Sequence, residues 1–233
     1  MKFLSQLITV GSGSVGGLVA SHNKGGNYFR AKVIPVNPQT DGQTEVRNAL
    51  TQLVDAWKNV LLGPKRNGWN LYAENVPVAD SLGQSIFLSG QQHFIRSNVP
   101  RLQFLGTGIA GAITTAPSLF DTGEIDSSAS MTLTAPSALA FTFDNTLAWA
   151  NEDDSLMIIY SGRPVNLSIF FFKGPYQIAG AVLGDGTIPP VSPAALTTQQ
   201  AYVAGQRIHT YARISRADGR LSAKFLQFRQ TVI

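Results

Sequence analysis

The chain of 233 residues contains no cysteine. Disulfide frameworks, cysteine-ligated metal sites and thiol nucleophiles are therefore excluded. Charged residues are also scarce, at 14%, whereas soluble domains usually contain about a quarter. A chain with so few charges keeps a largely neutral surface, which favours burial against partner proteins.

Long hydrophobic runs are missing as well. No apolar stretch approaches the roughly 20 residues that a transmembrane helix needs, so we expect no membrane-spanning segment and no membrane partner. The first apolar run is short and is interrupted by Ser5 and Gln6, which is atypical of a secretion signal.

Motifs of known catalytic chemistry do not occur: the sequence has no G-x-S-x-G, P-loop or H-E-x-x-H pattern. Gly11-x-Gly13-x-x-Gly16 matches the dinucleotide-binding fingerprint, but the turn-forming residues 22–26 follow too soon for the helix it requires. The three histidines, His22, His93 and His209, are far apart in the sequence and have no partners at metal-binding spacing. We therefore expect a non-enzymatic protein with no catalytic residue, metal or cofactor.

The N-terminal half is basic: residues 1–105 hold ten Lys and Arg against five Asp and Glu. The pattern predicts a β-hairpin with strands near 16–21 and 27–34, preceded by a strand over 3–10. Arg30 and Lys32 fall on one face of the second strand and could contact phosphate or carboxylate groups. A solvated edge strand protected by charge is the favoured explanation of this pair.

A helix is predicted after the Asn37-Pro38 turn, with Thr40 or Asp41 as its cap and Gly63-Pro64 as its stop. Apolar residues recur at three- and four-residue steps along one face; they are Val46, Leu50, Leu53, Val54, Trp57 and Leu61.

Two more helices are predicted, one from Pro64 and one from Ser89, which Pro100 should kink or end. We expect Trp57 and Trp69 to share an apolar cluster. Truncating Trp57 to alanine is predicted to cost about 3–5 kcal/mol.

Residues 106–128 are rich in Gly, Ala, Ser and Thr and have no helical period. Such a long structureless connection is unusual inside a compact domain, so we interpret it as a linker, with an arm that orders against a neighbouring subunit as the alternative. Seven short β-segments follow, over 131–134, 139–143, 156–161, 167–172, 177–183, 207–215 and 221–228. An Asp218-Gly219 turn separates the last two.

The sequence thus predicts an α+β protein in three parts. Residues 1–105 form a module of a β-hairpin and helices, 106–128 connect, and 129–233 form an antiparallel β-sandwich of immunoglobulin or fibronectin type III kind. The lack of cysteine favours the fibronectin-like version.

One motif resembles a family of uncharacterised proteins encoded by tailed bacteriophages and prophages. It reads Arg30-x-Lys32-x-x-Pro35-x-Asn37-Pro38-x-Thr40-x-x-Gln43-x-x-x-Arg47, followed by Trp57 and Trp69; Phe172-Lys173-Gly174-Pro175 and Arg216-Ala217-Asp218-Gly219-Arg220 are similar to stretches of the family's β-domain. Leu62 and Lys65 depart from the family's Thr and Gln, which puts the capping of the second helix in question. The resemblance implies a virion component that is assembled in the bacterial cytoplasm.

We therefore expect a structural protein of a bacteriophage virion, as a head decoration, connector or tail subunit, that contacts copies of itself and other virion proteins. The expected interface residues are Arg30, Lys32, Arg47, Lys65 and Arg66, and the motif core is Asn37, Pro38, Thr40, Trp57 and Trp69. A bacterial surface or filament adhesion protein is one alternative. A basic nucleic-acid-binding module is the other, and nucleic acid is the less favoured partner; steep loss of binding with salt would identify it.

Overall fold

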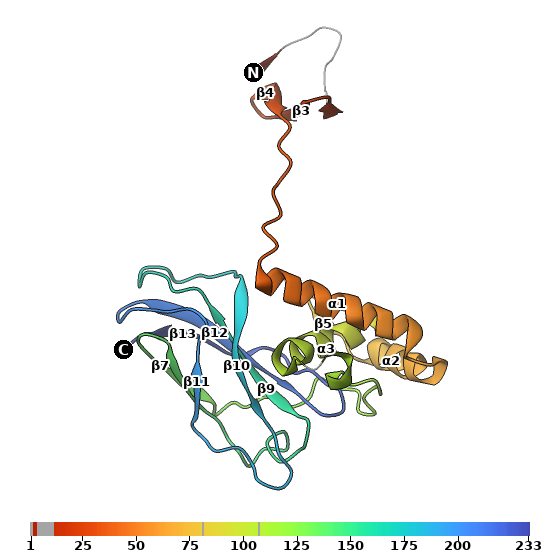
Figure 1. Ribbon diagram of the computed structural model, residues 1–233, viewed down its shortest axis with the longest axis vertical. Helices are drawn as coiled ribbons and strands as arrows, with labels where there is room; N and C mark the ends of the chain where they lie inside the picture. The colour runs from red at the N-terminus through yellow and green to blue at the C-terminus, as the bar shows by residue number, and fades with distance from the viewer. Residues whose placement is uncertain (1, 4–11, 81, 107) are drawn as a thin grey trace. The chain divides into compact units, whose positions relative to one another are not determined.

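The computed structural model describes residues 2–3, 12–80, 82–106 and 108–233. The chain forms two compact units, Met1–Asp41 and Gly42–Ile233 (Figure 1). This division differs from the predicted boundary after residue 105, because Arg101 hydrogen-bonds to Ser215 and Trp69 lies against Gly219.

The first unit contains a four-stranded antiparallel sheet with the order β1-β4-β3-β2. Its strands are β1 (Lys2–Phe3), β2 (Gly13–Val15), β3 (Leu18–Asn23) and β4 (Gly26–Ala31). The predicted hairpin is confirmed as β3 and β4, and the amide of Gly25 donates to Asn23 Oδ1 at 2.8 Å in its turn. Because β2 pairs with β3, residues 13–15 begin no helix, as a dinucleotide site would require. Most of the strand predicted over residues 3–10 lies outside the described residues.

Three helices follow: α1 (Asp41–Asn59), α2 (Gly63–Asn75) and α3 (Gly90–Leu105). α1 starts at Asp41 and so places Thr40 at its N-cap position. α2 starts at the predicted break with Pro64 in its first turn, but its N-cap is Leu62, which makes no side-chain cap hydrogen bond.

The apolar face of α1 is only partly buried. Its buried residues form a narrow stripe of Ala49, Leu53 and Ala56, about one helical turn apart. Leu50 stays exposed and Trp57 is half-buried.

Trp69 of α2 is the centre of the helical core. It is fully buried, with its ring 5.6 Å from Phe94 and 6.0 Å from Tyr72, edge-on to both. Trp57 lies 5.7 Å from the same Phe94. The prediction that Trp57 and Trp69 share one apolar cluster is confirmed.

α3 starts with a capping box. The amide of Gln92 donates to Ser89 Oγ at 3.3 Å, and the amide of Ser89 donates to Gln92 Oε1 at 2.8 Å. Pro100 does not end the helix, which continues to Leu105 and stops at Gly106 with a left-handed φ of 61°.

Two antiparallel sheets make up the C-terminal part. Their strands are β7 (Ser130–Thr134), β8 (Ala138–Thr142), β9 (Leu156–Gly162), β10 (Tyr176–Leu183), β11 (Ala194–Thr197), β12 (Arg207–Ser215) and β13 (Phe225–Thr231). One sheet has the order β10-β9-β12-β13 and the other β11-β8-β7, and both enclose one hydrophobic core. A small ladder of β5 (Val78–Ala79) and β6 (Ser85–Ile86) lies between α2 and α3 in the sequence. Helices and antiparallel sheets together confirm the α+β class.

Six of the seven predicted β-segments are strands, and residues 167–172 are not. That segment is a loop that leaves Phe170 and Phe171 exposed and packs Phe172 on Gly162, where a β-carbon would not fit. β11 was not predicted from the sequence, because Ala194 and Ala195 have low strand propensity.

Residues 106–128 are packed within the second unit instead of forming an open linker. After a short 3-10 helix, η1 (Gly108–Gly111), side chains of the helices bind their backbone. Trp69 Nε1 donates to the backbone carbonyl of Thr114 at 3.1 Å. The hydroxyl of Tyr72 donates to the backbone carbonyl of Asp121 at 2.7 Å. Burial raises the pKa of the Tyr72 hydroxyl to about 12.

The same segment is bound from the other side by the β12–β13 connection. Arg216 pairs with Glu124 at 3.1 Å and Arg220 pairs with Asp121 at 2.7 Å. Asp126, which is buried, accepts hydrogen bonds from the amides of Ser128 and Ala129, just before β7. These contacts join helices and sheets into one unit.

Candidate functional site

Residues 32–40 form neither helix nor strand, and we name them the connecting segment. Pro35 and Pro38 favour extended backbone in the residues that precede them. Three large apolar side chains of the segment are exposed: Val33 (79%), Ile34 (79%) and Val36 (90%). Exposed apolar side chains at this density are typical of surfaces that become buried against another molecule.

The predicted motif residues build the end of this segment. The amide of Gln39 donates to Asn37 Oδ1 at 3.3 Å, and Gln39 has a positive φ of 46°. Together with Pro38, this turn ends the extended backbone and places Thr40 directly before the first residue of α1. Trp57 and Trp69 belong instead to the helical core.

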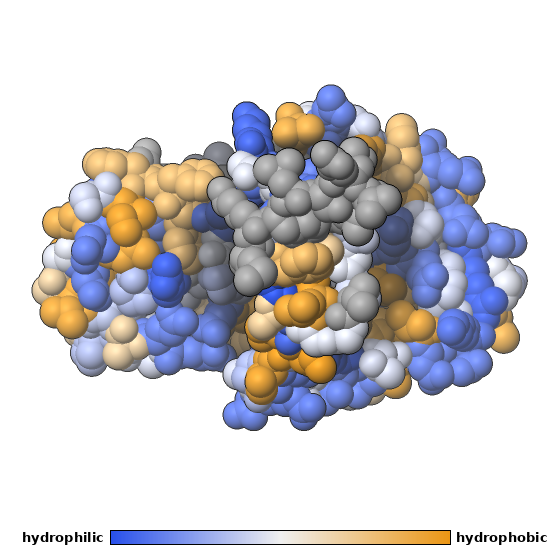
Figure 2. All heavy atoms as spheres, turned by 90° about the horizontal axis from the view of Figure 1, so that it is seen from above, coloured by the Kyte–Doolittle hydropathy of each residue, from blue (hydrophilic) through white to orange (hydrophobic). Residues whose placement is uncertain are grey.

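The described side chains of the first unit form no buried cluster. None of residues 12–14 and 16–41 is buried, and Leu18 of β3 is 51% exposed. A small sheet gains stability in water mainly by covering an apolar face. Figure 2 shows hydrophobic residues interspersed with hydrophilic ones over the visible face of the molecule.

Arg30 and Lys32 lie on and just after β4, and both are exposed. Arg30 is opposite Val19 of β3. The amide of Lys32 donates to the carbonyl of Gly17 at 2.8 Å, which extends the ladder by one step. The alternation of a strand places the two side chains on one face.

The other predicted interface residues belong to the second unit. Arg47 is exposed on α1. Lys65 Nζ donates to Thr114 Oγ1 at 2.8 Å, and the guanidinium of Arg66 donates to the carbonyl of Lys58 near the end of α1. Lys65 and Arg66 therefore make contacts within the second unit, and the structure does not gather the five cations into one patch within either unit.

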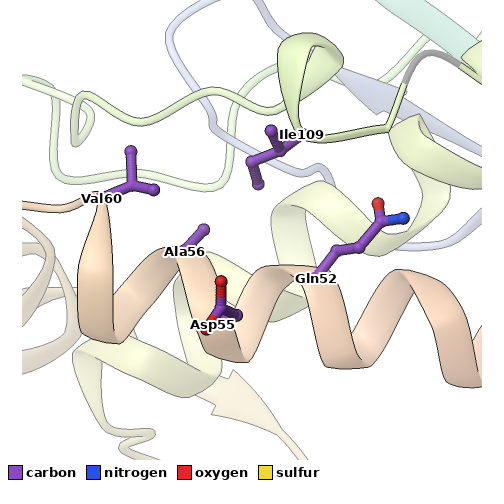
Figure 3. Close-up of a pocket in the computed structure, with 5 residues that line it drawn as sticks. All are labelled: Gln52, Asp55, Ala56, Val60 and Ile109. Carbon is purple, nitrogen blue, oxygen red and sulfur yellow. The ribbon is translucent and has the colours of Figure 1, made fainter.

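A pocket of about 230 Å³ opens along α1 (Figure 3). Its lining consists of Gln52, Asp55, Ala56, Val60 and Ile109. Asp55 is its one titratable group and accepts a hydrogen bond from Asn59 at 2.6 Å. The pocket is smaller than the roughly 300–1,000 Å³ of typical small-molecule sites.

Among the residues that the structure describes, no three His, Asp or Glu side chains are placed to hold a metal ion. No helix in the described ranges is long and apolar enough to cross a membrane.

The structure reveals a second candidate site that the sequence analysis missed, on the face of the β10-β9-β12 sheet away from the core. Tyr211 of β12 pairs with Tyr160 of β9, and their rings stack at 4.5 Å. Tyr176 of β10 meets Tyr211 edge-on at 4.9 Å, and Lys224 Nζ lies 4.7 Å from the centre of the Tyr211 ring. Arg213 follows Tyr211 by two residues, on the same face of β12. We call these five residues the tyrosine face.

The tyrosine face is partly desolvated. Burial raises the pKa of the hydroxyls of Tyr160 and Tyr211, and Arg213 lowers both to a smaller extent. Burial, and next the charge of Arg213, lower the pKa of Lys224. The five residues come from three strands and from the connection before β13, so they are far apart in the sequence. The only sequence signal for a shared face is that Tyr211 and Arg213 are two residues apart in one strand.

Comparisons with models of protein families, with curated proteins and with solved structures find no match to this chain.

Proposed function

We propose that the protein is a non-enzymatic structural subunit of a bacteriophage virion that binds copies of itself and other virion proteins. The supporting observation is the connecting segment, with Val33, Ile34 and Val36 exposed next to a sheet in which none of residues 12–14 and 16–31 is buried. Such a sheet and segment gain stability when a neighbouring chain covers them. The motif that resembles phage proteins extends over the same residues.

The β-region is proposed to be a sandwich of the immunoglobulin and fibronectin type. Counted from β7, its first, second and fifth strands form one sheet, and the fourth, third, sixth and seventh form the other. This order differs from an immunoglobulin constant domain in the fourth strand alone, which pairs with the third instead of the fifth. Such domains offer loops at both ends for contacts with neighbours. An experimental structure in which β7 to β13 do not form two sheets packed face to face would contradict the assignment.

Light scattering coupled to size-exclusion chromatography tests self-association of the full chain. We expect a mass of more than one chain that rises with concentration, and a lower mass for Ile34→Asp and Val36→Asp. Ile188→Asp is the matched control, because Ile188 is 73% exposed on a loop outside the connecting segment. A wild-type mass of one chain at every concentration would contradict the proposal.

The location in the virion needs a separate experiment. Mass spectrometry of purified phage particles should detect peptides of this chain in a fixed ratio to the major capsid protein. Its absence from particles that infect normally would exclude a structural role.

A further inference from the structure

The tyrosine face contains more positive charge than the chain neutralises. Arg213 and Lys224 both lie beside Tyr211: Arg213 follows it by two residues on the same face of β12, and Lys224 Nζ is 4.7 Å from its ring centre. None of the ion pairs in the described part of the chain includes Arg213 or Lys224.

Nearby acids are already paired with other cations. Glu124 and Glu152 both bind Arg216, at 3.1 and 2.6 Å. Asp121 and Asp218 both bind Arg220, each at 2.7 Å. The Nε of Arg213 is buried without a hydrogen-bond partner. A buried donor and mutually repelling cations are costly unless an anion joins them.

The tyrosine rings limit what that anion can be. Tyr160 covers one side of Tyr211, and Tyr176 and Lys224 also contact its ring. Stacking of nucleobases needs free aromatic faces, and the Tyr211 ring already has three neighbours. Ring edges and hydroxyl groups, which donate hydrogen bonds to anions, suit a compact oxyanion better.

We propose that Arg213 and Lys224, with the hydroxyls of Tyr160 and Tyr211, form a binding site for the phosphate group of a small phosphorylated molecule such as a sugar phosphate. Two cations match the near-double negative charge of a phosphate monoester better than the single charge of a carboxylate. Guanidinium groups and tyrosine hydroxyls supply the directed donors that phosphate oxygens accept. This site is independent of the connecting segment and of the proposed virion role.

Calorimetric titration of the full chain with inorganic phosphate, at constant ionic strength set by chloride, tests the site. We expect saturable binding that becomes roughly tenfold weaker in Lys224→Gln and in Arg213→Gln, as for the loss of one charged hydrogen bond. Lys58→Gln is the control, because Lys58 is also an exposed lysine but lies on α1. Lys224 is exposed as well, so its variant keeps the test valid if Arg213→Gln does not fold.

Glucose 6-phosphate and a ten-residue oligothymidylate separate the sources of the phosphate. We expect glucose 6-phosphate to bind at least as tightly as inorganic phosphate and to show the same dependence on Lys224. If the oligothymidylate alone binds through Lys224 and Arg213, the small-molecule assignment is wrong and the face binds nucleic acid. If phosphate produces no heat beyond the chloride control, or binds the Lys224 variant unchanged, the site does not exist.

Discussion

Gly219 lies so close to Trp69 that a β-carbon on Gly219 would be 3.0 Å from Cη2 of the indole ring. The glycine belongs to the turn between β12 and β13, and the tryptophan to the helical core. A turn of the β-region therefore closes the pocket of the largest buried side chain among the helices. This contact explains why residues 42–233 form one unit.

Gly219→Ala should destabilise the protein more than Gly205→Ala. Both glycines have positive φ, 96° and 83°, so each alanine is strained by about 1–2 kcal/mol. Only at position 219 does the new methyl group also meet Trp69, which adds on the order of 1 kcal/mol. Urea unfolding of the two variants measures the difference. Equal losses would mean that the indole ring moves freely away.

Trp69→Ala should cost about 3–5 kcal/mol of the free energy of unfolding. The sequence analysis predicted this loss for Trp57, but Trp57 is half-buried, whereas Trp69 is fully buried and donates a hydrogen bond to Thr114. We expect a smaller loss for Trp57→Ala, measured in the same unfolding experiment. The reverse ranking would contradict the assigned core.

Asn98→Ala should cost roughly 1–3 kcal/mol, because it leaves buried backbone groups without partners. The amide of Ile113 donates to Asn98 Oδ1 at 2.6 Å, and Asn98 Nδ2 donates to the Ile113 carbonyl at 3.2 Å. Asn59→Ala removes an exposed hydrogen bond and should stay within about 0.5 kcal/mol of wild type. If the two variants unfold alike, residues 106–128 are less tightly held than the structure shows.

Stability should fall as the pH drops below about 6.5. Burial, and next the positive charge of Arg96, lower the pKa of His93 below its ordinary value of 6.5. The unfolded chain therefore binds a proton at a higher pH than the folded chain, so acid favours unfolding. Urea midpoints between about pH 7 and pH 5 should decrease less steeply for His93→Phe than for wild type. Parallel curves would mean that His93 is not the responsible group.

Local signals account for the parts of the fold that the sequence predicts well. The turn around Gly25, the break at Gly63-Pro64 and the capping box at Ser89 each depend on neighbouring residues, and the corresponding elements form. Residues 106–128 have no such signal, because their partners Asn98, Trp69 and Arg216 lie outside them. The loop over 167–172 has strand composition, but Phe172 packs on Gly162 instead.

The tyrosine face escaped prediction for a related reason. Counting charge by halves of the chain places the basic excess before residue 106, whereas the unmatched cations Arg213 and Lys224 come from the other half. Arg213 and Lys224 have no ion-pair partner among the described residues, because the nearby carboxylates form ion pairs with Arg216 and Arg220. Only the folded arrangement shows which charges remain.

The position of Gly219 has a consequence for synthesis of the chain. The turn that covers Trp69 is synthesised about 150 residues after Trp69 itself. At elongation rates of about 5–20 residues per second, this delay is roughly 8–30 s. During that interval the indole ring lacks one wall of its pocket, and the nascent helices expose apolar surface. Translation should therefore be the period in which the protein is most in need of chaperones.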